Sequence, residues 1–272
     1  MATKEAEVAS NEHPTYHPHG DGTNGGHDLG RQISVTLTPQ QFEELYLQPS
    51  VKSRNQMNLI KTFGNPTAFG IVSFLLTLMP TSCCLMGWRG ASSNSLLALV
   101  GAFYFMGGMA MIIASLLEWI VGSTFPFLVF GSFGTFWLTL AAYVDPRLEV
   151  QASLLKAEGG SAATYYVPFG YYLVFWSVYT YFLTFAAFRT NVVLVWILLF
   201  VALTFSTLGA AYLKFGEGAL ATGGNLVIAA GACGFTACMG GFYILLHLCL
   251  AATDFPFNIP LFDLAHLWGN KQ

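Results

Sequence analysis

Long apolar runs without a single Asp, Glu, Lys or Arg alternate along this chain with single charges or short charged clusters. Six such runs are present: 62–88, 90–117, 119–144, 159–188, 190–213 and 218–253. Each is longer than the roughly 20 apolar residues that a helix needs to cross a bilayer. A soluble protein would need charged side chains on the outer faces of its helices, and these runs offer none. The pattern predicts an all-α integral membrane protein with six transmembrane helices.

Flanking charges and prolines place the helices within these runs. We expect them at 66–88, 95–121, 125–144, 168–188, 191–213 and 224–252. Pro80 lies inside the first helix and should kink it or end its regular part. Pro168 lies near the predicted start of the fourth helix, a position that proline favours. The connection 145–166 is the longest and the most charged between two predicted helices.

Two short clusters are consistent with an internal duplication. The first helix opens with Pro66, Phe69 and Gly70, and the fourth opens with Val167-Pro168-Phe169-Gly170. With three helices in each half, the two halves would be inverted repeats, as in many transporters.

The chain is expected to have three regions: a polar N-terminal tail at 1–61, the transmembrane domain at 62–252 and a C-terminal tail at 253–272. The N-terminal tail is rich in Gly, His, Asn and Pro near its start, which predicts disorder. No Cys/His zinc spacing accompanies its histidines, so we expect no metal site and no cofactor. A long tail without the apolar core of a signal peptide predicts that both termini lie in the cytosol.

Composition narrows the class of function. Hydrophobic residues make up 54 % of the chain and charged residues 9 %, against about 25 % charged in soluble domains. The net charge of −3 without a basic patch argues against nucleic acid as a partner. Common enzyme signatures such as GxSxG, HExxH and the P-loop are missing, so we expect a protein that is not an enzyme.

The second predicted helix carries the most informative polar group. Tyr104, Gly108, Met111, Ser115 and Glu118 recur at helical spacing and are expected on one face. An acidic residue in a membrane helix is a functional candidate by default, and Glu118 is our candidate for a proton-linked group. The alternative is a boundary glutamate that reaches interfacial water or an arginine on a neighbouring helix.

Aromatic residues gather in the second, third and fourth helices. A few of them would form an apolar constriction, of the kind that gates by dewetting, while the others face lipid or packing partners. Few polar groups are available inside the bundle, and His247 is interpreted as a neutral packing histidine. This composition suits a path for a small solute better than a catalytic site.

The segment Phe63-Gly64-Asn65-Pro66-Thr67-Ala68-Phe69-Gly70-Ile71 resembles the helix-1 signature of the acetate uptake transporter family, also called the succinate–acetate permease or Gpr1/Fun34/YaaH family. Asn65, Pro66 and Gly70 match the signature, and Thr67 departs from it. Further matching stretches are Phe103-Tyr104 with Gly107-Gly108, Ser115-Leu-Leu-Glu118, and Ser132-Phe-Gly134-Thr-Phe136-Trp137. The resemblance covers about 62–252, and the long polar tail is similar to that of the fungal branch.

The resemblance implies a plasma-membrane transporter or channel for acetate and similar small monocarboxylates, with proton-linked transport and a hexameric assembly. It implies a solute path lined by Asn65, Pro66, Thr67 and Gly70, and a narrowing at Phe74. Tyr104, Met111, Phe136 and Trp137 are expected along the same path. Met111 stands where the family often has a polar residue, so the path should be less polar here.

Two alternatives stay open at this point. Some fungal relatives are linked to ammonium export, so ammonia or ammonium is an alternative solute. A membrane sensor of nutrients or acid, which signals through the tail, is the alternative from a different class.

Overall fold

The computed structural model describes residues 63–157 and 161–264. The predicted tail at 1–61 lies outside these residues, so its predicted disorder and its histidines are not described. The described residues are helical and contain no strand, which confirms the all-α class. Their elements are α3 (Thr67–Leu85), η1 (Trp88–Gly90), η2 (Ser93–Leu99), α4 (Val100–Ala102), η3 (Phe103–Ala110), α5 (Met111–Val121), α6 (Thr124–Val144), η4 (Pro146–Leu148), α7 (Val150–Ala157), α8 (Ala162–Ala187), α9 (Val192–Gly216) and α10 (Leu220–Ala252).

Five of the six predicted spans are long and apolar enough to cross a membrane: Thr67–Leu85, Asn94–Val121, Thr124–Val144, Val192–Gly216 and Leu220–Ala252. The remaining predicted span is α8, a helix of 26 residues without a charged side chain. Its six tyrosines lower its mean hydropathy, although the ring of each is apolar over most of its surface. Length and composition therefore confirm five of the six predicted spans, and α8 stays a prediction.

The second span is not the regular α-helix that the sequence predicts. It begins as a 3₁₀ segment, η2, and its centre, η3, is π-helical over Phe103–Ala110. Two glycines let this segment lie against its neighbours: a Cβ on Gly107 would lie 2.6 Å from Trp137 Cγ, and one on Gly108 would lie 2.2 Å from Leu138 Cδ2. The Tyr104 hydroxyl donates to Asp145 at the end of α6, whereas Glu118 accepts from Thr67 at the start of α3.

The connection between α6 and α8 differs most from the prediction. The fourth long helix, α8, begins at Ala162 rather than at 168, so Pro168 lies inside it. Tertiary packing explains the earlier start: Tyr165 stacks on Tyr143 with ring centroids 4.9 Å apart, and Tyr166 packs edge-on to Tyr212 at 5.9 Å. The predicted loop 145–166 also contains η4 and the short helix α7.

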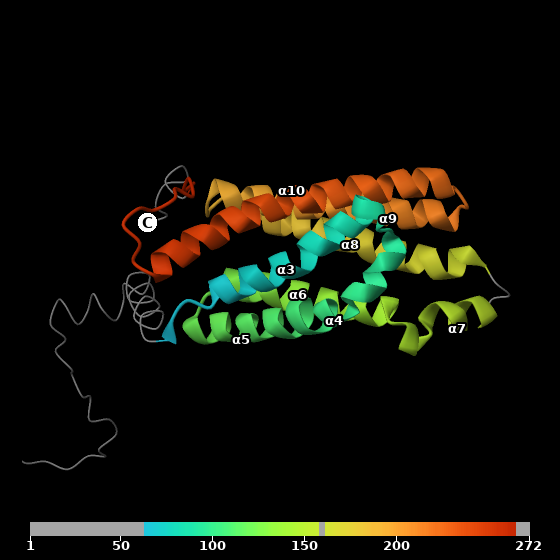
Figure 1. Cartoon of the computed structure of the whole chain (residues 1–272), viewed down its shortest axis with the longest axis horizontal. Coiled ribbons are helices and arrows are strands. Elements are labelled where there is room, and N and C mark those ends of the chain that lie inside the picture. The colour runs from blue at the N-terminus through green and yellow to red at the C-terminus, as the bar shows by residue number, and fades with distance from the viewer. Residues whose placement is uncertain (1–62, 158–160, 265–272) are drawn as a thin grey trace, which may run out of the picture. The chain divides into compact units, whose positions relative to one another are not determined.

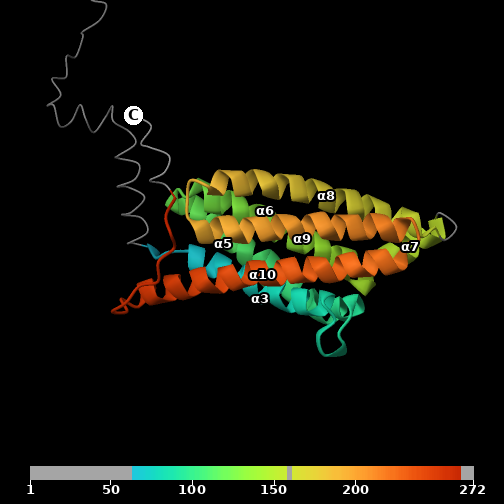
Figure 2. The same cartoon turned by 90° about the horizontal axis from the view of Figure 1, so that it is seen from above.

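The long helices run alongside one another in a bundle, as Figure 1 shows. Helix α9 packs between α8 and α10, α3 packs on α10, and α6 packs on α5 and η3 (Figure 2). Helices α3 and α10 approach closely because small residues face α3. A Cβ on Gly234 would lie 2.5 Å from Ser82 Oγ, and one on Gly241 would lie 2.6 Å from Leu75 Cδ2.

The chain after α10 folds back onto the bundle. His247 Nδ1 lies 2.7 Å from the Ile259 carbonyl oxygen, and the Tyr243 hydroxyl donates to the Pro260 carbonyl at 2.8 Å. The Val192 N–H donates to the Phe262 carbonyl at 3.0 Å, so the segment reaches the start of α9. His247 therefore holds this segment in place, in agreement with the expected packing role.

Candidate functional site

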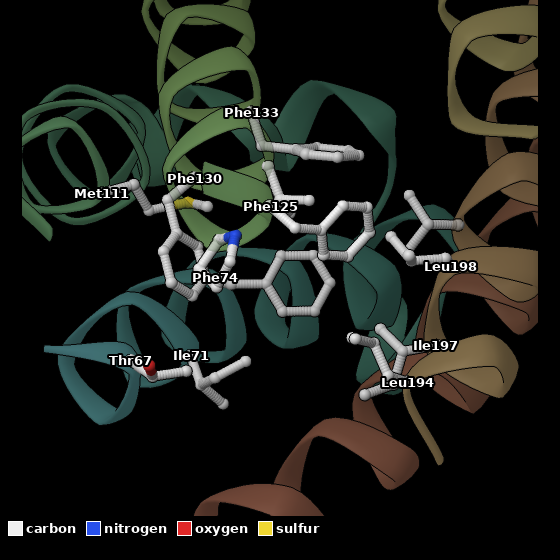
Figure 3. A pocket seen from close by; sticks show the side chains of 13 residues that line it. Thr67, Ile71, Phe74, Met111, Phe125, Phe130, Phe133, Leu194, Ile197 and Leu198 are labelled. Atoms are coloured by element: carbon white, nitrogen blue, oxygen red, sulfur yellow. The ribbon is translucent and has the colours of Figure 1, made fainter. Parts of the chain in front are cut away.

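Two cavities lie inside the bundle, one towards each end. The smaller, of about 80 Å³, lies where α3, α6 and α9 begin and is shown in Figure 3. It is lined by Thr67, Ile71, Phe74, Met111, Phe125, Pro126, Val129, Phe130, Phe133, Leu194, Ile197, Leu198 and Val201. Thr67 contributes the polar side chain of this lining, and the rest is apolar. We call this space the small cavity.

The larger cavity, of about 710 Å³, lies where the same three helices end. Helix α3 lines it with Thr81 and Leu85, α6 with residues from Phe136 to Val144, and α9 with residues from Leu208 to Phe215. Asp145, Glu149 and Lys156 contribute charged side chains to its wall. We call this space the large cavity. Because α3, α6 and α9 line both cavities in succession, the two cavities follow one another along the bundle.

Aromatic side chains separate the two cavities. Phe133 lines the small cavity and Phe136, one turn further along α6, lines the large one. Phe205 of α9 lies edge-on to Phe136 with centroids 4.8 Å apart, and Trp176 of α8 lies 5.2 Å from Phe136 and 5.5 Å from Phe133. We call these four residues the aromatic plug. Any solute that moves from one cavity to the other along α6 has to displace or pass these rings.

The polar group nearest the small cavity is a pair of side chains. The Thr67 hydroxyl donates a hydrogen bond to Glu118 Oε1. Glu118 is 1 % exposed, although it is charged at neutral pH in an ordinary setting. The Thr67 N–H donates to Asn65 Oδ1 at 3.0 Å, so Asn65 satisfies one of the free donors at the start of α3. Polar atoms therefore gather directly behind the apolar wall at one end of the small cavity.

At the rim of the large cavity, Asp145 is buried and paired. Arg147 donates to it from its backbone N–H at 3.0 Å and from its guanidinium at 2.6 Å, and the Tyr104 hydroxyl donates at 3.3 Å. The hydrogen bonds from the Arg147 side chain and backbone lower the pKa of Asp145 to about 2. Asp145 thus remains an anion at any physiological pH and fixes the π-helical segment to the end of α6.

Some of the predicted path residues line a cavity, some lie at the start of α3, and some pack behind the lining. Thr67, Phe74 and Met111 line the small cavity, and Phe136 lines the large one. Asn65 and Pro66 form the start of α3, where the Pro66 carbonyl accepts from the Phe69 N–H at 3.0 Å. Glu118 touches the cavity lining through Thr67.

The remaining three predicted path residues line neither cavity. Gly70 packs against α6, where a Cβ would lie 2.5 Å from Phe130 Cε2. Trp137 is buried and stacks on Phe103 with centroids 5.3 Å apart. Tyr104 is bonded to Asp145. These three residues pack behind the side chains that line the cavities.

Sequence reasoning did not single out Phe205, Asp145 or the α9 residues of the small cavity. Phe205 is one of several aromatic residues along α9, and nothing local distinguishes it from the others. Asp145 carried a signal, because an aspartate after a helix and before Pro146 is a common turn residue that accepts from its own backbone two residues on. Among the described residues, no group of three or more His, Cys, Asp or Glu side chains comes together as a metal site would require.

Comparison with known proteins identifies relatives over most of the chain. Residues 47–266 match the sequence model of the GPR1/FUN34/yaaH family. The protein alcS of Aspergillus fumigatus is 35 % identical over 243 residues, which cover 88 % of each chain. The acetate transporter protein patA of Penicillium expansum is 33 % identical over 209 residues, 77 % of this chain and 81 % of that protein.

A solved structure shares the fold. The bacterial acetate channel SatP superposes with a TM-score of 0.58 at 24 % sequence identity, over 72 % of this chain and 98 % of the channel. At this identity, the likeness concerns the arrangement of the helices.

Proposed function

The chain belongs to the GPR1/FUN34/yaaH family of membrane proteins, and we propose that it carries acetate and similar small monocarboxylates across a membrane. The observation that carries this proposal is the succession of the large cavity, the aromatic plug and the small cavity along α3, α6 and α9. The relatives include two acetate transporters and an acetate permease, which supports transport rather than catalysis.

The size and chemistry of the small cavity support a small, weakly polar solute. Its volume of about 80 Å³ is a fraction of the volume that drug-sized ligands occupy. The Thr67 hydroxyl donates its hydrogen bond to Glu118, behind the wall, so the surface that faces the solute is apolar. A two-carbon acid matches such a space, with its methyl group against Phe74 or Met111.

The lining also favours the neutral acid over the anion. Moving an isolated carboxylate past apolar rings costs far more free energy than moving the protonated acid, because nothing there replaces its hydration. We infer that the acid crosses the plug with its proton, so that flux rises as the pH falls. Glu118 is the proposed proton-linked group, because it is the buried carboxyl that touches the lining.

The finer aspects of the proposal come from the family resemblance. We propose the plasma membrane as the location, cytosolic termini and a hexameric assembly. Broad apolar faces on the outer sides of the bundle, such as Phe175, Phe182 and Phe185 of α8, are suitable for contact with lipid or with another subunit. No feature of the described residues favours ammonia passage or a sensor role, which remain alternative predictions.

The proposal is tested by flux into liposomes that contain the purified protein. Labelled acetate is followed at pH 5 and pH 7, and protein-free liposomes of the same lipids give the background leak of acetic acid. Saturable entry above this leak, faster at pH 5, is the expected result. A flux no greater than the leak, with ammonia passing in a parallel measurement of internal pH, would favour the ammonia alternative.

A further inference from the structure

The large cavity is much larger than a two-carbon solute requires. Its volume of about 710 Å³ lies within the range of roughly 300–1,000 Å³ that is typical of ligand sites. Such sites are mostly apolar and aromatic, with a few polar groups that orient the ligand. The wall of this cavity combines an aromatic side with a polar side. The aromatic side is formed by Tyr143, Tyr166, Phe169, Tyr212 and Phe215, and the polar side includes Asn94, Asp145, Glu149, Gln151 and Lys156.

These rings are held in fixed positions by one another. Tyr143 stacks on Phe169 with centroids 3.8 Å apart, and Tyr212 lies 5.2 Å from Phe169. The Tyr143 hydroxyl donates to the Tyr165 carbonyl at 3.1 Å, which fixes this ring further. A rigid aromatic wall favours a flat ring, because ring pairs gain free energy beyond the apolar area that they bury.

Lys156 supplies the group that would select a carboxylate. It lines the cavity and takes part in no ion pair within 63–157 and 161–264, whereas the Asp145 carboxylate is neutralised by Arg147. Glu149 lines the same cavity and opposes an anion. Tyr166 and Tyr212 also line the cavity.

The two cavities differ in which molecules they admit. An apolar cavity of about 150 Å³ takes up benzene. The large cavity exceeds this volume several times over, and the small cavity, at about 80 Å³, falls short of it. A ring-sized acid therefore enters the first space and does not fit the second.

We propose that the large cavity binds monocarboxylates with a ring-sized apolar body, carboxylate towards Lys156 and ring against the tyrosines, and that they block the path instead of crossing it. The blocking effect rests on the proposed acetate transport, whereas the binding does not. Benzoate is the probe, and benzyl alcohol is its matched control, because it keeps the ring and lacks the charge.

Benzoate binding to the purified full-length protein is measured by titration calorimetry, and its effect on labelled acetate flux is measured in liposomes. We expect Lys156→Met to weaken benzoate binding about two- to fivefold, because Lys156 is exposed and an exposed ion pair contributes up to about 1 kcal/mol. Lys156→Arg should retain binding, and Glu149→Gln should strengthen it. Benzyl alcohol should bind equally to the wild type and to Lys156→Met.

Lys214→Met is the control variant, because Lys214 is paired with Glu217 and does not line the cavity. The proposal is overturned if benzoate does not bind, if Lys156→Met and Lys214→Met have the same affinity, or if labelled benzoate crosses as fast as acetate. If the variants bind benzoate as expected but the protein carries no acetate, the proposed transport function is wrong and the proposed binding site is still supported.

Discussion

The Thr67 hydroxyl donates a hydrogen bond to the Glu118 carboxylate, and this bond joins the start of α3 to the last turns of α5. The two residues are 51 positions apart in the chain. Thr67 belongs to the lining of the small cavity and Glu118 lies directly behind it. A change of protonation at Glu118 therefore acts directly on its hydrogen bond with Thr67, a residue of the cavity wall.

The first prediction concerns the pH dependence of transport. Glu118→Gln keeps the size of the side chain and its ability to accept the Thr67 hydrogen bond, and it removes the titrating proton. We expect the ratio of acetate flux at pH 5 to flux at pH 7 to fall to the ratio of neutral acetic acid at the two pH values, with protein yield in the membrane unchanged. Glu217→Gln, at an exposed site, is the control and should leave the ratio as it is. An unchanged ratio in Glu118→Gln would remove the proton role from this residue.

A second prediction concerns solute size. Phe205→Ala shortens one ring of the aromatic plug and widens the passage between the two cavities. We expect this variant to transport butyrate at a rate closer to that of acetate, whereas the wild type favours acetate. Phe182→Ala is the matched control, because Phe182 is 69 % exposed. If both variants have the selectivity of the wild type, Phe205 does not limit solute size.

A third prediction concerns stability. Gly70→Ala places a methyl group where a Cβ would lie 2.5 Å from the Phe130 ring, so the ring or the helix has to move. Overpacking of this kind costs about 1–3 kcal/mol, which should lower the midpoint of thermal unfolding of the purified protein by several degrees. Gly101→Ala meets nothing within 4 Å and should match the wild type or exceed its stability. Equal midpoints for the two variants would mean that Gly70 is not packed as described.

The ion pair at the rim of the large cavity gives a fourth prediction. The pKa of Asp145 is about 2, below its ordinary value of 3.8, so its pairing with Arg147 stabilises the folded protein above pH 4. This contribution is lost as the pH falls through about 2. Asp145→Asn should therefore melt at a lower temperature than the wild type at pH 7, and the difference should shrink towards pH 2. A difference that is constant across this range would show that the charge is not responsible.

The same pKa separates two sources of pH dependence. Asp145 stays ionised at both pH 5 and pH 7, so it does not contribute to a change of flux between them. An effect in this range has to come from the solute or from another group, of which Glu118 is our candidate.

The sequence predicts the membrane class and most helix positions because these depend on short stretches of chain. Charge-free runs identify five spans that the structure confirms, and three of them end at the predicted residue: Val121, Val144 and Ala252. The early start of α8 and the π segment η3 depend on contacts between distant residues, such as Tyr165 with Tyr143 and Gly107 with Trp137. The pattern of residues within one helix does not predict such contacts.

The site is predicted in part for the same reason. Thr67, Phe74 and Met111 belong to helices with a recognisable motif or spacing, and they line the small cavity. The opposite wall comes from α9, whose apolar sequence does not distinguish Leu198 or Val201 from residues that face lipid. Which of them face inwards is decided by the packing of α9 between α8 and α10.

The central claim is that solute passes through the small cavity, and the most direct test is acetate flux through a protein in which this space is filled. Val201→Trp places an indole in a cavity of about 80 Å³, whereas Val178→Trp adds the same side chain to a position that is 44 % exposed. Labelled acetate uptake at pH 5 is compared in liposomes with equal amounts of each folded variant. The account predicts wild-type flux for Val178→Trp and flux at the level of protein-free liposomes for Val201→Trp. Wild-type flux through Val201→Trp would contradict it.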